Sequence, residues 1–495
     1  MWGWPLGMQI GGPTDDARRV DRTPVNDDRD PVLGVSRRKP ISGAGLAYGL
    51  TRPSILVFLC LGTLMHLGID VAQITARTRR WDFSHYYVAA LAMRDGLNSY
   101  AIDLRPLGQH LGLDGIARAT DTPFFLLCFE PLTLLRPAAA YWSWFAINAA
   151  SLVLAMFLIL RAAPRFDRRQ TISLCAIILL YPPLSNHIFF AQTQIVVLLL
   201  LVLAMRSFQS GRDRSAGVAL AVAGLLKAFP LIIVGYFIVQ RRWRAFAWTL
   251  AGVIAGTAAT VIAFGVQRNV SFVAGTYLTR SAGFLARPAN VALGSFVSRW
   301  FWYASGAVTM SPWLNWTRAL TVIAVEVSVF GLTVFATLPL VSSTHDSSPE
   351  YSHEISPGKA VDTADRTSRQ FALWVTAAIM LSPTAWIHYL VLLILPFMLI
   401  AAAGWNGTAR PRVVWLMAAS YTAISLSMAI TGSAHGSLAA RPYLKTALEE
   451  FATISLLLAY AAAWFFAYDN TVVSGDSDAR LNAHKGNEVN LCHQP

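Results

Sequence analysis

The sequence predicts an all-α polytopic membrane protein with about twelve transmembrane helices. Hydrophobic residues make up 55% of the 495 residues, and charged residues only 14%. Several uncharged runs approach or exceed the ~20 residues with which a helix crosses a hydrocarbon core of ~30 Å. The predicted spans are residues 53–72, 139–160, 171–183, 188–206, 215–227, 229–240, 246–266, 317–341, 370–383, 386–404, 411–430 and 450–468.

Basic residues orient the chain in the membrane. Residues 1–50 mix Pro, Gly and Asp with many arginines, which predicts a disordered basic tail. Because cytoplasmic segments are enriched in Lys and Arg, this tail places the N-terminus inside the cell. No short apolar run with a small-residue cleavage site follows, so we expect no removable signal peptide. The net charge of +13 then reflects membrane orientation and anionic lipid rather than nucleic-acid binding.

The polar segments define five regions. After the tail we expect an N-terminal membrane module over 51–341, a polar cytoplasmic loop over 342–369, C-terminal membrane helices over 370–468 and a polar cytoplasmic tail over 469–495. The loop 73–138 of the first module lies outside the plasma membrane in this topology. Two segments suit the interface: TPFFLLCFEPLTLLRP at 122–137, which an acid and a proline interrupt, and NVALGSFVSRWFWY at 290–303, which is rich in aromatics.

One apolar stretch allows two interpretations. Residues 216–239, AGVALAVAGLLKAFPLIIVGYFIV, form either one helix with Lys227 near its centre or a hairpin of two short helices. The hairpin, broken from Lys227 to Pro230, is favoured. A lysine at mid-bilayer costs several kcal/mol, and proline cannot donate a helical hydrogen bond.

Several common classes of site have no support. The four cysteines, Cys60, Cys128, Cys175 and Cys492, are scattered without the spacing of a zinc site or a disulfide framework. Neither GxGxxG nor GxxxxGK[ST] occurs, so no nucleotide-binding loop is indicated. We expect no cofactor.

Polar residues that border the apolar segments gather on the outer face of this topology. They come from five separate places in the chain: Asp82, His85 and Tyr86; His187, Gln192 and Gln194; Lys227; Arg287 and Asn290; Trp386 and His388. Ionisable groups in or beside membrane spans are costly to desolvate and are therefore functional candidates. Their convergence predicts an active site at the membrane surface.

Each of these residues also has a structural interpretation. Asp82 could cap the first turn of a helix over 83–93, and His85 could reach the headgroups from an interfacial helix. Gln192 and Gln194 could join helices by hydrogen bonds. Lys227 could extend to the surface or form a structural pair. Tyr86 and the nearby aromatics could belong to an interfacial belt.

Six motifs in order resemble glycosyltransferase family 87, whose members are GT-C enzymes that use polyprenyl-phosphate sugars, among them mannosyl- and arabinofuranosyltransferases. The acidic motif D-x-x-x-Y resembles DFSHYY, and a proline-containing segment with a P-L step resembles TPFFLLCFEPL. Y-G-Q-x-N resembles FAQTQ, G-x-K-x-x-P resembles LLKAFP, and S-P-x-S-W-x-H-H resembles SPTAWIHY. N-Q-S-x-x-G-x-x-x-R resembles NVALGSFVSR only at Asn290 and Arg299, because Val291 and Ala292 replace Gln and Ser.

The resemblance implies a membrane glycosyltransferase with a GT-C bundle and extracytoplasmic interfacial helices. Asp82 is then the catalytic base, with Lys227, His388, Gln192 and Arg287 binding the phosphate and sugar of the donor. Weaker candidates for substrate binding are His85, Tyr86, Gln194, Asn290, Arg299 and Trp386. The partners implied are the lipid bilayer, a polyprenyl-phosphate sugar and a glycolipid or polysaccharide acceptor, with mannose or another hexose favoured. No second acid forms a DxD pair with Asp82, so we expect no obligatory metal.

Two other functions remain open at this stage. A transporter or flippase for a lipid-linked or anionic solute would also place charges among broken helices, although no internal repeat is visible. A non-catalytic partner in envelope polysaccharide assembly would carry a degenerate site, whereas Asp82, Lys227 and His388 are present.

Overall fold

The structure is a computed structural model that describes residues 50–76, 81–113, 117–162, 166–278, 287, 289–305, 311–338, 357–433 and 450–468. The predicted tails at 1–50 and 469–495 and most of the loop 342–369 lie outside these residues. All described residues belong to one compact unit, Ile41–Pro495. Every regular element among them is a helix, and one isolated β-bridge joins Asn290 to Trp386.

Seven helices are long and apolar enough to cross a membrane in the described part of the chain. They are α2 (Pro53–Ala76, apolar over Pro53–Ala72), α6 (Pro137–Ala162), α12 (Trp243–Phe264), α16 (Pro312–Thr337), η4 with α18 (Ile387–Trp405), α19 (Pro411–Ser433, apolar over Pro411–Ala429) and Glu450–Tyr468. An eighth span is possible if α7 (Arg168–Leu179) and α8 (Pro182–Phe190), bent by 54°, count as one. The predicted all-α, multispanning membrane class is confirmed.

The count of spans is lower than the twelve predicted. Three predicted spans correspond to helices that are too short to cross alone: α9 (Gln194–Gln209), α10 (Asp213–Leu226) and η2 with α11 (Phe229–Ile233 and Val234–Val239). The predicted span 370–383 is the apolar end of α17 (Pro357–Met380), whose first half carries several charges. Hydropathy found these segments correctly, but it did not reveal that they are short or charged.

The stretch 216–239 is broken at the predicted position. Helix α10 ends at Leu226, and Lys227 has the extended backbone angles φ −145° and ψ 126°. The chain then turns into η2, which packs back against α10. A Cβ on Gly224 of α10 would lie only 2.4 Å from the Leu231 side chain of η2. The single continuous helix is therefore excluded.

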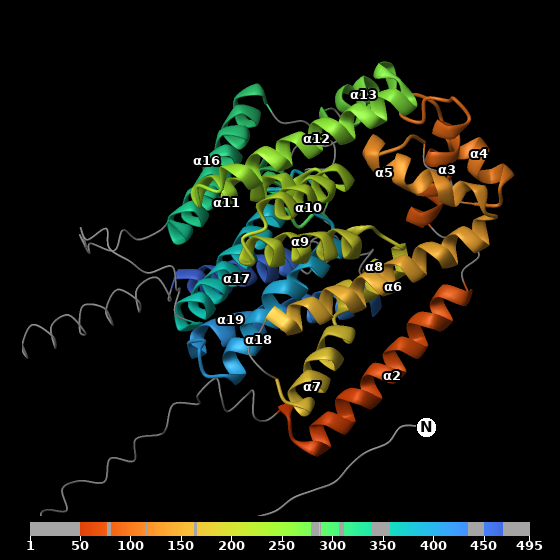
Figure 1. Ribbon diagram of the computed structural model, residues 1–495. Coiled ribbons are helices and arrows are strands. Elements are labelled where there is room, and N and C mark those ends of the chain that lie inside the picture. Colours follow the sequence, from red (N-terminus) through yellow and green to blue (C-terminus); the bar gives the residue numbers. More distant parts are fainter. Residues whose placement is uncertain are drawn as a thin grey trace, which may run out of the picture. The chain divides into compact units, whose positions relative to one another are not determined.

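Short helices gather beside the ends of α6 and α12 (Figure 1). They are α3 (Trp81–Arg94), α4 (Arg105–His110) and α5 (Pro123–Phe129), followed by the 3-10 turn η1 (Glu130–Leu134). The Thr122 hydroxyl accepts a hydrogen bond from the Phe125 amide at 3.1 Å, which caps α5. Segment 122–137 thus forms short non-spanning helices, as predicted, and 290–303 contains most of α15 (Leu293–Ser305). The remaining described helices are α13 (Val266–Ser271) and the π-helix η3 (Phe272–Leu278).

Helix α3 is packed inside the protein for most of its length. Val88, Ala90 and Ala92 are fully buried, and the helix lies against α5 and η1. Small residues also allow α10 to pack closely against α12: a Cβ on Gly217 of α10 would lie 2.4 Å from the Ala245 carbonyl oxygen of α12. Close approach of this kind is typical of membrane helix interfaces. The packing fixes the position of Asp82, the second residue of α3.

Candidate active site

Asp82 makes its contacts with side chains rather than with the start of its own helix. Its Oδ2 accepts a hydrogen bond from Gln192 Nε2, and its Oδ1 lies 3.5 Å from His85 Nδ1, one turn further along α3. Among the described residues, no backbone N–H of α3 donates to the carboxylate. About a quarter of the side chain, 24%, is exposed. The geometry therefore favours a site residue over a helix cap.

Gln192 connects Asp82 to Tyr86. Its Oε1 accepts a hydrogen bond of 2.7 Å from the Tyr86 hydroxyl, while its Nε2 donates to Asp82. The amide thus uses its acceptor and one donor within the described structure, and its side chain is buried. The DFSHYY and FAQTQ motifs are therefore in direct contact, because Gln192 of the second binds Asp82 and Tyr86 of the first.

The turn that presents Gln192 has unusual backbone geometry. Ala191 ends α8 in the left-handed region, with φ 53° and ψ 46°. Its carbonyl accepts a hydrogen bond of 2.7 Å from Trp144 Nε1, which fixes the turn to α6. The resembling motif has glycine at this position, and glycine adopts positive φ without the steric cost that alanine bears.

Lys227 forms a buried ion pair with Asp121, a residue that the sequence analysis missed. Nζ lies 2.9 Å from Asp121 Oδ1, and only 14% of the lysine and 5% of the aspartate side chain are exposed. The ammonium also lies 6.0 Å from the centroid of the Tyr86 ring. Lys227 therefore does not extend to the surface, and the break in α10 places its charge beside α3.

The signal for Asp121 was present but incomplete. It lies directly before the capping residue Thr122 in an interfacial segment. Nothing local shows that its carboxylate meets a lysine 106 residues later.

His388 lies in η4, beside the turn that carries Lys227. Its ring centroid lies 5.2 Å from that of Tyr389 and 6.3 Å from that of Phe190. Tyr389 stacks on Phe229, two residues after Lys227, at 5.2 Å. The SPTAWIHY, FAQTQ and LLKAFP motifs are thus brought together by aromatic contacts. His187 accepts a hydrogen bond of 3.2 Å from the Ile195 amide, and Gln194 accepts one of 3.1 Å from the Thr193 amide.

Asn290 and Arg299 hold backbone segments together. Asn290 Oδ1 accepts hydrogen bonds from the amides of Ala385 at 2.8 Å and Ala292 at 3.2 Å. Arg299 binds both carboxylate oxygens of Glu450, at 2.5 and 2.8 Å, and donates to the Asn290 carbonyl at 2.7 Å. These contacts favour a role in positioning the segment that contains Trp386 over direct substrate binding.

Arg287 and Trp386 lie beside Asn290: the Arg287 carbonyl accepts a hydrogen bond of 3.0 Å from the Asn290 amide, and Trp386 forms the isolated β-bridge with Asn290. Arg287 is exposed, and its carbonyl accepts a hydrogen bond of 3.0 Å from Arg299. The structure therefore gathers Asp82, His85, Tyr86, Gln192 and Lys227 in one cluster with Asp121, and His388 borders it.

Burial and charge tune the two titratable groups at the start of α3. Burial and, next, the negative charge of Asp121 raise the pKa of Asp82 from 3.8 to about 6, against the opposing effects of Gln192 and Lys227. Burial lowers the pKa of His85 to about 4. At neutral pH, Asp82 is therefore an anion beside a neutral imidazole. A carboxylate with a pKa near 6 is better matched to proton transfer at neutral pH than an ordinary one.

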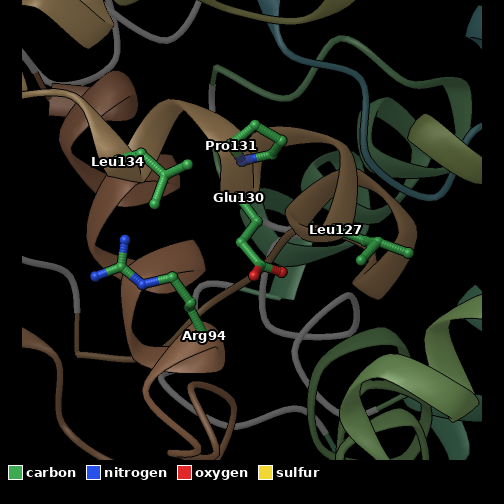
Figure 2. A pocket seen from close by; sticks show the side chains of 5 residues that line it. All are labelled: Arg94, Leu127, Glu130, Pro131 and Leu134. Carbon is green, nitrogen blue, oxygen red and sulfur yellow. The ribbon is translucent and has the colours of Figure 1, made fainter.

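A pocket lies at the other end of α3 (Figure 2). Arg94, Leu127, Glu130, Pro131 and Leu134 line it, and Arg94 is anchored to the Thr133 carbonyl at 3.0 Å. None of the predicted site residues lines this pocket. No group of three or more His, Cys, Asp or Glu side chains could hold a metal ion among the described residues.

Comparison with protein families supports the resemblance that the motifs predicted. Residues 120–350, which include Asp121, Gln192, Lys227 and Asn290, match the model of glycosyltransferase family 87. This segment, a little under half of the chain, is similar to glycosyltransferase family 87, the family that the motifs resemble. The match to a glycosyltransferase model, together with the spanning helices, indicates a membrane glycosyltransferase, as the motifs predicted. It argues against the transporter and flippase interpretation.

Solved structures and curated proteins add less. The fold is similar to two structures of ArnT from Cupriavidus metallidurans, one bound to undecaprenyl phosphate and one in the apo state. They share 13% and 12% identity with this chain, with TM-scores of 0.36 and 0.35, and each alignment covers 83% of this chain and 77% of ArnT. No curated protein matches the chain.

The Ala191 turn leads to a stability prediction. Glycine at position 191 removes the steric cost of the left-handed conformation, of about 1–2 kcal/mol, but loses more backbone entropy on folding, about 0.5–1 kcal/mol. We expect Ala191→Gly to stabilise the detergent-solubilised protein by up to about 1 kcal/mol, measured as a higher midpoint of thermal unfolding. Ala191→Val should lower that midpoint. Destabilisation by glycine would show that the turn is unstrained.

Proposed function

We propose that the protein transfers a sugar, preferably mannose or another hexose, from a polyprenyl-phosphate donor to a lipid or polysaccharide acceptor. The reaction takes place on the extracytoplasmic face of the plasma membrane, with Asp82 as general base. The observation that carries this proposal is the cluster itself: a partly exposed carboxylate, oriented by Gln192, in the same cluster as the Lys227 ammonium.

The proposed reaction uses a carboxylate as base and a cation that stabilises the leaving phosphate. The acceptor hydroxyl attacks the anomeric carbon, and its proton passes to the Asp82 carboxylate as the new C–O bond forms. The bond between that carbon and the phosphate oxygen breaks, and the polyprenyl phosphate leaves with the electron pair. Attack opposite the leaving group inverts the anomeric centre. General-base assistance contributes ~10²–10⁴ in rate.

Lys227 is the proposed ligand of the donor phosphate. An ammonium held in place before reaction stabilises negative charge that develops on the leaving group, often the largest single contribution to catalysis. His388, beside the Lys227 turn, is proposed to bind the phosphate or the sugar, and Gln192 to orient sugar hydroxyls. Arg287, which is exposed, is proposed as a second cation for the phosphate. No cofactor or obligatory metal is proposed.

Replacement of Asp82 tests the base. Asp82→Asn keeps the shape of the side chain but cannot accept the proton, so we expect transfer to fall at least ~100-fold while folding is retained. The assay incubates purified protein with radiolabelled polyprenyl-phosphate mannose, arabinose or glucose and analyses the glycosylated lipid product. The matched control is Asp95→Asn, an exposed acid just after α3 that pairs with Arg94. Near-normal turnover by Asp82→Asn would assign Asp82 to structure instead.

The raised pKa of Asp82 predicts the acid limb of the rate profile. The carboxyl holds its proton up to about pH 6, so the base form is present above that pH and is lost as the pH falls through it. We expect kcat/KM to fall about tenfold per unit below about pH 6. Initial rates in mixed buffers of constant ionic strength measure the profile. An acid limb near pH 4 would instead show that the titrating carboxylate is exposed to water and has an ordinary pKa.

The proposed orientation is tested separately. Leu97, 45% exposed just after α3, lies outside in the proposed topology, whereas residue 350 lies in the cytoplasm. In a background without the four cysteines, Leu97→Cys should react with an impermeant thiol reagent in intact cells, and Glu350→Cys only after lysis. Labelling of both from one side would contradict the predicted orientation.

A further inference from the structure

Asp121 is fastened to the Lys227 turn at several points. Its backbone carbonyl accepts a hydrogen bond of 2.8 Å from the buried Tyr100 hydroxyl. The next residue, Thr122, donates through its hydroxyl to the Leu225 carbonyl at 2.6 Å, near the end of α10. The Asp121 carboxylate then meets Lys227 Nζ at 2.9 Å. The start of α5 and the end of α10 are thus held in register around one ion pair.

The pair leaves most of the lysine's hydrogen-bonding capacity unused. A Lys ammonium has three donors. In the described structure one of them binds Asp121, and no second acceptor lies within hydrogen-bond distance. The centroid of the Tyr86 ring, a face that accepts no conventional hydrogen bond, lies 6.0 Å from the ammonium. The charge is therefore anchored on one side and still able to donate to an incoming phosphate.

We propose that Asp121 is a positioning residue that holds the Lys227 ammonium, charged and correctly oriented, for the phosphate of the donor lipid. This inference rests on the proposed function. A buried lysine without a counter-ion tends to lose its proton or to turn toward water. Asp121 prevents both, while the fixed α5–α10 contact keeps the lysine beside the end of α3 where Asp82 lies.

A second effect of Asp121 distinguishes a positioning role from a role in stabilising the fold alone. The negative charge of Asp121 also acts on Asp82, whose pKa it raises. Removing that charge should therefore weaken donor binding through Lys227 and, independently, move the acid limb of the rate profile to lower pH. A residue that only stabilised the fold would change neither in protein that remains folded.

The test uses Asp121→Asn, with Asp103→Asn as matched control. Asp103 is an exposed acid in the same α3–α5 connection and pairs with Arg105. Binding of a polyprenyl phosphate to the purified full-length protein is measured directly, alongside the KM for the donor, kcat and the pH profile. We expect Asp121→Asn to weaken binding and raise KM at least tenfold, with a smaller change in kcat. Asp121→Glu, which keeps the charge, should recover part of the loss.

A double variant shows whether Asp121 acts through the lysine. When Lys227→Met already removes the ammonium, adding Asp121→Asn should weaken polyprenyl-phosphate binding no further. This neutral pair also leaves no unpaired buried charge, so it provides folded protein if Asp121→Asn alone does not fold. Additive losses, or wild-type binding by folded Asp121→Asn, would overturn the inference. Absence of transfer by the wild-type protein with every donor would overturn the proposed function instead, because binding is measured independently of turnover.

Discussion

The ion pair between Asp121 and Lys227 is the interaction on which the arrangement of the site depends. A lysine buried among apolar helices is strongly unfavourable unless an opposite charge lies beside it. The chain meets this requirement by ending α10 at Leu226 and bringing the start of α5 against the break. The pair therefore explains why two short helices replace one long span here, and why the segment that begins α5 packs against the end of α10. Tyr86, Gln192 and Asp82 are then arranged beside it from α3 and the α8–α9 turn.

A second group of polar residues stabilises the segment that leads into His388. Arg299 binds Glu450 with two hydrogen bonds and also donates to the carbonyl of Asn290, whose side chain accepts the amide of Ala385. Together they attach α15 to the last described helix and fix the segment that leads into His388. Breaking such a buried pair by removing one partner is strongly destabilising. Asn290 and Arg299, which match a motif of the family, thus support the site by holding the backbone around it. The motif alone does not reveal this structural role.

Local signals in the sequence predicted much of this structure. Lys227 followed closely by Pro230 is sufficient to indicate a broken helix, because both residues are costly in a continuous span. The order of the motifs likewise predicted that Asp82 and Gln192 share a site. What could not be predicted are contacts between distant segments: Asp121 with Lys227, or Arg299 with Glu450. Span lengths failed for a similar reason, because burial within the protein allows helices such as α9 to be short and still apolar.

The break after Leu226 also has an electrostatic consequence that involves no side-chain acid. The aligned peptide dipoles of a helix place about half a negative charge at its C-terminal end. Lys227 is the C-cap residue of α10, so this positively charged residue directly follows the negative end of the helix. The Thr122 hydroxyl donates to the Leu225 carbonyl, which would otherwise lack a helical partner. Part of the field that favours the charged lysine is therefore a property of the polypeptide backbone, and it persists whatever residue occupies position 121.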